Sequence, residues 1–132
     1  LRDSKSWAYV DALATHVMGP LVTADAKLNR TLDRWAKDDN FWIRRSALLA
    51  LLVPLREGGG DFARFGRYAD PMLDEREFFI RKAIGWILRE TSRKQQRLVF
   101  AWLVPRAKRL SGVTMREAVK YLTPAQRARL AR

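Results

Sequence analysis

Two hydrophobic patterns overlap in the stretch Glu77-Phe78-Phe79-Ile80-Arg81-Lys82-Ala83-Ile84-Gly85-Trp86-Ile87-Leu88-Arg89-Glu90. The first pattern is an apolar stripe at helical spacing, formed by Ile80, Ala83, Ile84, Ile87 and Leu88. At about 100° per residue, Phe79 and Trp86 then lie on the far side of the helix, beside Lys82 and Arg89. The stripe predicts a helix packed on a core, and the aromatic, basic face opposite needs a second contact.

Two kinds of contact fit that second face. A neighbouring helix is one, because a helix that is apolar all round is usually buried. Nucleic acid is the other, because its backbone attracts cations while its sugars and bases pack on aromatic rings. The stretch alone leaves both alternatives open.

The composition favours a polyanionic partner. The chain of 132 residues has the size of one domain, and its 48% hydrophobic content excludes wholesale disorder. Lys and Arg number 26 against 14 Asp and Glu, which leaves a net charge of +12. Nucleic acid is the commonest partner for such a charge, followed by an anionic membrane surface and an acidic protein. A membrane is disfavoured, because the sequence has no apolar run of about 18 residues and no N-terminal signal pattern.

Metal and thiol chemistry are also disfavoured. The chain has no cysteine, which excludes disulfides, thiolate catalysis and cysteine-ligated zinc. Its one histidine, His16, cannot form a site that needs several histidines, and we assign it no role. We therefore expect neither a metal nor a cofactor.

Helical spacing without strand alternation predicts an all-α fold. The expected helices span residues 5–21, a segment capped by Thr23 that runs to about 35, and residues 40–56, 61–68, 77–90, 93–109 and 114–122, with a last basic helix or a frayed tail from Pro124. Residues 47–53 are apolar on all sides, so we expect the helix over 40–56 to be central and Pro54 to bend or end it. Pro71 is expected to stop the helix over 61–68, and the glycines at 58–60 to form a flexible connection.

In the helix over 93–109, the apolar side is expected at Leu98, Ala101 and Trp102, and its end at Pro105. Asp74 and Glu75 are expected as acidic residues at the N-terminus of the helix that carries the opening stretch.

A repeat becomes visible when the helices are aligned. The matching segments are Ile43-Arg44-Arg45-Ser46-Ala47, Ile80-Arg81-Lys82-Ala83-Ile84 and Met115-Arg116-Glu117-Ala118-Val119, at offsets of 37 and 35 residues, with residues 7–12 one period earlier. Periods of this length, each with two helices, are typical of an α-α superhelix of HEAT-like repeats. The second helix of each pair then lines one groove, which Lys82, Trp86, Arg45, Trp7 and Asp11 are expected to face.

Three segments resemble the signature segments of the AlkD family of bacterial DNA alkylation repair glycosylases. They are Lys5-Ser6-Trp7-Ala8-Tyr9-Val10-Asp11, Asp38-Asp39-Asn40-Phe41-Trp42-Ile43-Arg44-Arg45 and the stretch over 77–90, and Arg116-Glu117-Ala118 fits the last repeat of the family. The resemblance implies that residues 1–132 form a single HEAT-like domain, the C-terminal portion of a longer chain.

The resemblance further implies a base excision repair enzyme that hydrolyses the N-glycosidic bond of purines alkylated at N3 or N7 in double-stranded DNA. Trp7 and Trp86 match the tryptophans that hold the deoxyribose, Asp11 matches the catalytic carboxylate, and Arg45 matches a DNA backbone contact. Arg44, Phe79, Lys82 and Arg89 are expected as further DNA contacts. We expect a monomer, or a protein that depends on a preceding segment, acting in the bacterial cytoplasm at the nucleoid.

Plainer interpretations exist for each residue and for the chain. Asp11 taken alone would be a solvated helix carboxylate, and Arg45 could form an ion pair with Asp11 or another carboxylate. Trp35, Trp42 and Trp102 are interpreted as packing residues. The alternatives to a glycosylase are a non-catalytic DNA-binding protein of the same fold and a protein-interaction solenoid.

Overall fold

The computed structural model describes residues 26–131. Within this range every regular element is helical, which confirms the all-α prediction. The elements are α3 (Ala26–Trp35), α4 (Phe41–Leu49), α5 (Leu52–Arg56), α6 (Phe62–Met72), α7 (Phe78–Ser92), α8 (Gln96–Leu103), the 3-10 helix η2 (Val104–Arg109), α9 (Gly112–Ala118) and α10 (Pro124–Leu130). The helix expected over 5–21 and the expected Thr23 cap lie outside the described residues.

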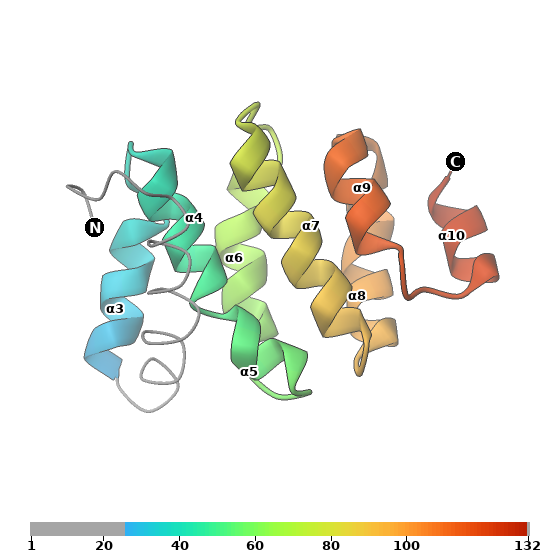
Figure 1. The fold of residues 1–132 in the computed structure, drawn as a ribbon, viewed down its shortest axis with the longest axis horizontal. Helices are drawn as coiled ribbons and strands as arrows, with labels where there is room; N and C mark the ends of the chain where they lie inside the picture. The colour runs from blue at the N-terminus through green and yellow to red at the C-terminus, as the bar shows by residue number, and fades with distance from the viewer. Residues whose placement is uncertain (1–25, 132) are drawn as a thin grey trace.

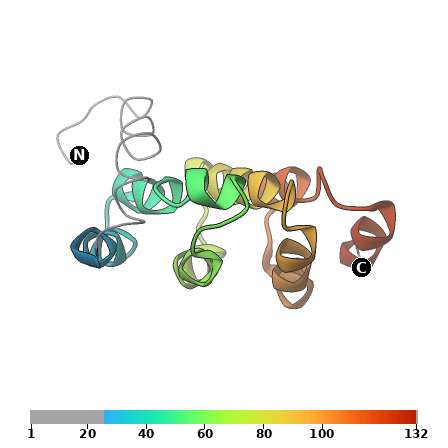
Figure 2. The same ribbon diagram turned by 90° about the horizontal axis from the view of Figure 1, so that it is seen from below.

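The helices form two layers (Figures 1 and 2). One layer holds α4, α5, α7 and α9, and the other holds α3, α6 and α8. Successive pairs cross from one layer to the other, as in an α-α superhelix. The residues aligned by the sequence repeat, Ile43, Ile80 and Met115, fall on α4, α7 and α9 and therefore in one layer.

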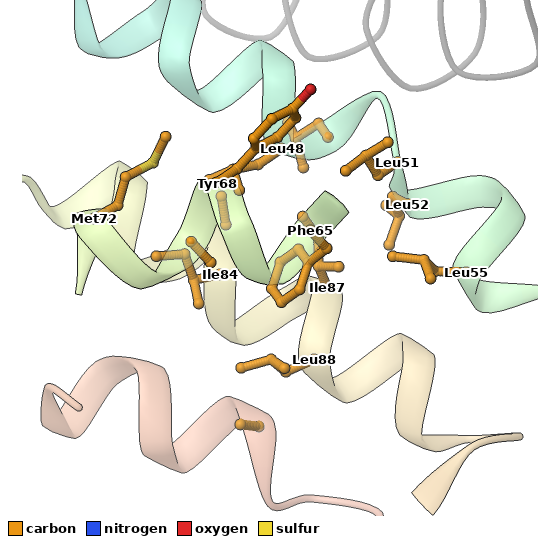
Figure 3. Packing of buried hydrophobic residues seen from close by; sticks show 14 of the residues in the cluster. Leu48, Leu51, Leu52, Leu55, Phe65, Tyr68, Met72, Ile84, Ile87 and Leu88 are labelled. Carbon is orange, nitrogen blue, oxygen red and sulfur yellow. The ribbon is translucent and has the colours of Figure 1, made fainter. Parts of the chain in front are cut away.

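The central helix is α7, which contacts α4, α5, α8 and α9. Its predicted stripe is confirmed, because Ile80, Ala83, Ile84, Ile87 and Leu88 are each at most 1% exposed. Leucines of α4 and α5 and the aromatic residues of α6 pack around this stripe (Figure 3). The prediction that the helix over 40–56 is central was wrong, although its apolar run is buried as expected.

A break at residues 50–51 divides the helix that was expected to be continuous over 40–56. Pro54 explains the break, because proline has no N–H for the carbonyl of Ala50 and its ring clashes with the carbonyl four residues earlier. The chain therefore ends α4 at Leu49 and restarts at Leu52, which places Pro54 in the first turn of α5, where proline is tolerated. The prediction that Pro54 bends or ends the helix is confirmed, but the break lies about four residues before the proline.

Three other helix ends differ from the predictions. Pro71 lies inside α6, which continues to Met72, since a proline in a last turn loses a single intrahelical bond. Residues 93–95 form the turn between α7 and α8 instead of helix. The helix then changes to 3-10 geometry at Val104, with Pro105 in the first turn of η2.

The apolar side of α8 is shifted by one residue from the prediction. Val99 and Leu103 are fully buried, whereas Leu98 is 40% exposed. The last helix is confirmed as a helix rather than a tail, with a capping box between Thr123 and Gln126.

Candidate nucleic-acid interface

A cavity of about 360 Å³ opens at α4, α7 and α9 and contains most of the predicted DNA-contact residues. Its lining residues are Arg45, Phe78, Phe79, Lys82, Trp86, Arg89 and Glu117. We call this set the α7 cavity. The structure thus brings together Arg45 from one repeat, the far side of α7 from the next, and Glu117 from a third.

The far side of α7 forms the aromatic wall of the α7 cavity. Because the stripe of α7 faces the core, residues three and four positions apart on the other side share one surface. Phe79 and Trp86 are partly buried there, and Phe78 at the start of the helix is 51% exposed. Trp42 supports this wall, with its ring centroid 5.0 Å from that of Phe79. Trp42 therefore has the packing role expected for it, next to the cavity.

Arg45 reaches the α7 cavity from α4 and is only 4% exposed. Its guanidinium donates a hydrogen bond to the backbone carbonyl of Phe79 and lies 5.9 Å from the centre of the Phe79 ring. A side chain held in this way can meet a DNA phosphate only inside the cavity. The predicted backbone contact by Arg45 stays a prediction.

Arg44 points elsewhere. Its Nη1 donates to the backbone carbonyls of Asp38 at 2.7 Å and Asp39 at 3.0 Å, and its Nη2 lies 2.6 Å from Glu75 Oε1. The guanidinium thus ties the start of α4 to the turn before α7, and it lines a different cavity of about 580 Å³. The structure does not bring Arg44 to the α7 cavity, and its predicted DNA contact is untested.

The ion pair between Arg44 and Glu75 involves one of the two acidic residues that were expected at the N-terminus of α7. The first turn of α7 contains no acidic residue, and its N-cap Glu77 makes no side-chain capping bond. Glu75 binds Arg44 instead, and Asp74 lies 3.8 Å from Arg109. These carboxylates therefore hold neighbouring segments rather than cap the helix.

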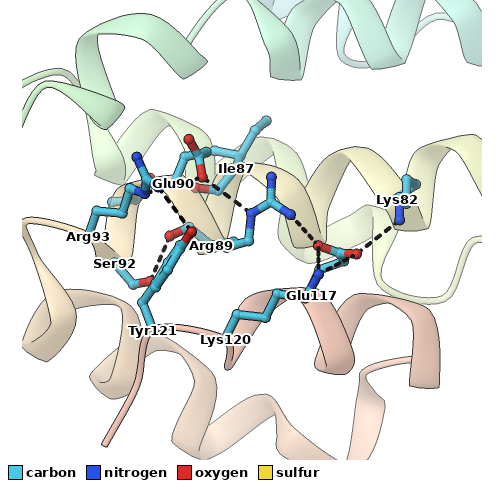
Figure 4. A network of polar contacts seen from close by, with 10 residues as sticks. Lys82, Ile87, Arg89, Glu90, Ser92, Arg93, Glu117, Lys120 and Tyr121 are labelled. Atoms are coloured by element: carbon cyan, nitrogen blue, oxygen red, sulfur yellow. Dashed lines mark hydrogen bonds and ion pairs between the residues drawn. The ribbon is translucent and has the colours of Figure 1, made fainter.

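Glu117 is a cavity residue to which the sequence analysis gave no functional role. Its carboxylate accepts from Lys82 Nζ at 2.9 Å and from Arg89 Nη1 at 2.7 Å, and Lys120 Nζ lies 3.3 Å away (Figure 4). The hydrogen bond from Lys82, helped by Lys120, lowers the pKa of Glu117, and burial opposes this effect. The carboxylate is therefore ionised at neutral pH.

The repeat contained a signal for Glu117. Glu117 lies 35 residues after Lys82, which is one repeat period, so the two residues occupy equivalent helices in adjacent repeats. A carboxylate at that offset from a basic residue predicts an ion pair between repeats.

Gly85 allows α9 to approach α7 closely enough for this contact. A Cβ at position 85 would lie 2.8 Å from Glu117 Cβ and 3.1 Å from the carbonyl oxygen of Thr114. Thr114 Oγ1 donates to the carbonyl of Arg81 at 3.0 Å and fixes the same contact. The absence of a side chain at Gly85 thus places Glu117 beside the cavity.

The other tryptophans of the described region have packing roles. Trp35 packs against the core cluster. Trp102 contacts the rings of Phe62 and Phe65. The guanidinium of Arg106 stacks over the Trp102 ring, 4.4 Å from its centre. Trp7, Asp11 and His16 lie outside the described residues, so their predicted roles, or lack of one, are not tested.

The arrangement can bind an anion and a cation at the same time. Lys82 and Arg89 suit phosphate, and the ring faces of Trp86 and Phe79 suit a sugar that carries positive charge. Across residues 26–131 there is no cluster of three or more potential metal-ligating side chains. In that same part of the chain, no helix combines the length and the apolar character needed to cross a bilayer.

Comparisons with known proteins identify the family of the chain. Residues 1–122 match the sequence profile of the DNA alkylation repair enzyme family. A solved structure of a predicted DNA alkylation repair enzyme from Enterococcus faecalis has 31% identity and a TM-score of 0.72, with 90% of this chain and 54% of that one covered. The chain therefore spans about half the length of that protein. A comparison with curated proteins gave no match.

Proposed function

Since the chain belongs to the DNA alkylation repair enzyme family, we propose that it acts as a DNA N-glycosylase on cationic N3- or N7-alkylated purines in duplex DNA. The proposed reaction is hydrolysis of the bond between the purine and the deoxyribose. The observation that carries the proposal is the α7 cavity, whose lining combines the aromatic rings of Trp86 and Phe79 with the cations Lys82 and Arg89.

The chemistry of the substrate suits this cavity. Alkylation at N3 or N7 makes the purine cationic, so the base leaves as a neutral molecule and needs no strong general acid. Positive charge develops on the sugar instead. The face of Trp86 would stabilise that charge by about 0.5–2 kcal/mol. A site of this kind selects lesions by their charge and does not require a hydrogen-bonding pocket for the base.

The family resemblance assigns the catalytic carboxylate to Asp11, with Trp7 as the second indole. A carboxylate at roughly 4 Å from the cationic sugar attracts it by about 4 kcal/mol at an effective dielectric constant near 20. That energy corresponds to about a thousandfold in rate. The same carboxylate can orient the attacking water.

The DNA backbone is the proposed partner of the cations. The net charge of +12 favours association with a polyanion, and Lys82 with a 46% exposed side chain is positioned to meet phosphate at the cavity. If so, log affinity falls with log salt by about 0.9 for each phosphate neutralised.

A base-release assay on methylated duplex DNA tests the proposal. We expect the protein to release N3- or N7-methylpurine, and Asp11→Asn to lose most of the release while it still binds DNA. A chain that binds DNA with normal salt dependence and releases no base would support the non-catalytic alternative. A binding affinity that does not change with salt would contradict both DNA functions.

A further inference from the structure

We propose that Glu117 is a positioning residue for DNA binding, which holds Lys82 and Arg89 on either side of Trp86 and limits the strength of the DNA contact. The proposal rests on the function proposed above. It assigns to α9 a part in the α7 cavity, whose aromatic lining residues within the described part of the chain belong to α7.

The carboxylate of Glu117 uses both oxygens for this task. Oε1 accepts from Lys82 Nζ at 2.9 Å, and Oε2 accepts from Arg89 Nη1 at 2.7 Å. Lys82 lies four residues before Trp86 and Arg89 three residues after it, so all three share one face of α7. One carboxylate therefore binds both Lys82 and Arg89 (Figure 4), the residues that precede and follow Trp86 on this face.

The side chain of Glu117 is less exposed to solvent than the two basic side chains that it binds. The side chain of Glu117 is 11% exposed, whereas the side chains of Lys82 and Arg89 are 46% and 25% exposed. The two basic side chains are thus more accessible to a ligand than the carboxylate that binds them. A DNA phosphate that approaches the cavity meets oriented donors, but part of their charge is already neutralised.

The backbone determines where this carboxylate lies. The missing side chain at Gly85 admits the Cβ of Glu117, and the hydrogen bond from Thr114 to the carbonyl of Arg81 ties α9 to α7. Because its Cβ is held between α9 and α7, Glu117 can follow the cations toward DNA only as far as rotation of its own side chain allows. Lys82 and Arg89 must therefore divide their interactions between Glu117 and phosphate, which weakens non-productive binding and keeps the cations in register with Trp86.

Two variants of Glu117 separate its charge from its position. Glu117→Gln removes the charge and keeps the shape, while Glu117→Asp keeps the charge and withdraws it by one methylene. Asp74→Asn is the matched control, because it raises the net charge equally at a side chain that is 79% exposed and outside the α7 cavity. Each protein is assayed for affinity to undamaged duplex over a range of salt, for single-turnover base release at saturating methylated duplex, and for thermal unfolding.

We expect Glu117→Gln to bind undamaged DNA about 3- to 10-fold more tightly, with a salt slope steeper by about one, because the released cations neutralise a further phosphate. We expect its single-turnover rate to fall about 10-fold, since Lys82 loses this ion pair and Arg89 keeps only the one with Glu90 at 3.2 Å. Glu117→Asp should keep the wild-type salt slope and still lose rate, and Asp74→Asn should match the wild type in rate.

Binding by folded Glu117→Gln that is equal to or weaker than wild type would overturn the proposal, as would an unchanged single-turnover rate in both Glu117 variants. A merely structural role would lower the unfolding temperature and weaken binding together. If the wild-type protein releases no base, the glycosylase function fails, but the salt slopes still decide whether Glu117 limits DNA binding.

Discussion

Gly85→Ala should destabilise the protein, although alanine is the better helix former. The added Cβ would lie 2.8 Å from Glu117 Cβ and 3.1 and 3.2 Å from the carbonyl oxygen and Cα of Thr114. Two of these three atoms belong to the backbone of α9, so α9 has to move away from α7. Such overpacking costs about 1–3 kcal/mol, and weakening the hydrogen bond from Thr114 to Arg81 adds about 1 kcal/mol.

The gain in helix propensity offsets about 1 kcal/mol of this cost. The expected net loss is therefore about 1–3 kcal/mol in the free energy of unfolding, or roughly 4 °C in the unfolding temperature for each kcal/mol in a chain of this size. Urea titration followed by circular dichroism measures the loss. Gly112→Ala is the control, because its Cβ would meet only the guanidinium of Arg116 at 3.0 Å, at the end of a flexible, exposed side chain. A Gly85→Ala protein as stable as wild type, or more stable, would refute the close-packing argument.

Two further predictions concern residues away from the cavity. Burial and the hydrogen bond to Asp33 raise the pKa of Tyr68 to about 12, so the folded state keeps a proton that the unfolded state loses near pH 10. The free energy of unfolding should therefore decline between about pH 10 and 12, and Tyr68→Phe should flatten that decline in urea titrations; an equal decline in the variant would contradict the assignment. Arg44→Met should lower the free energy of unfolding by about 2 kcal/mol through its lost bonds to Glu75 and the carbonyl of Asp38, and leave the salt slope of DNA binding unchanged. A slope smaller by about one would instead make Arg44 a phosphate contact.

Local patterns were sufficient to predict α7 and its two faces. The stripe of Ile80, Ala83, Ile84, Ile87 and Leu88 is repeated at helical spacing over the whole helix. The spacing therefore indicates which side of α7 faces the core. In α8 the run Leu98-Val99-Phe100-Ala101-Trp102-Leu103 is apolar at nearly every position, so spacing could not decide which side faces the core. Packing against neighbouring helices decided it, and buried Val99 and Leu103.

The site was most predictable where one helix carries it. Phe79, Lys82, Trp86 and Arg89 follow from the geometry of α7, and the structure places them in one cavity. Contacts between helices were harder to predict from the sequence, because they depend on how closely two helix backbones approach each other. Gly85 controls that distance, and a glycine in an apolar helix does not reveal from sequence alone which neighbour fills its space.

Arg44 and Arg45 show the same limit, since adjacent residues on a helix point about 100° apart. One guanidinium lies in the α7 cavity, and the other binds Glu75 in the turn before α7. The family resemblance matched Arg45 to a DNA backbone contact, whereas the expectation for Arg44 did not take this difference in direction into account.

The division of the α7 cavity among three repeats has a consequence for how such a protein can diverge. The indole and the cations depend on a helix whose other side is the centre of the core, so most substitutions there would also disturb folding. The carboxylate depends on α9, whose main neighbour is α7 alone. A single substitution at position 117 would thus change the net charge of the α7 cavity and leave the hydrophobic core unchanged.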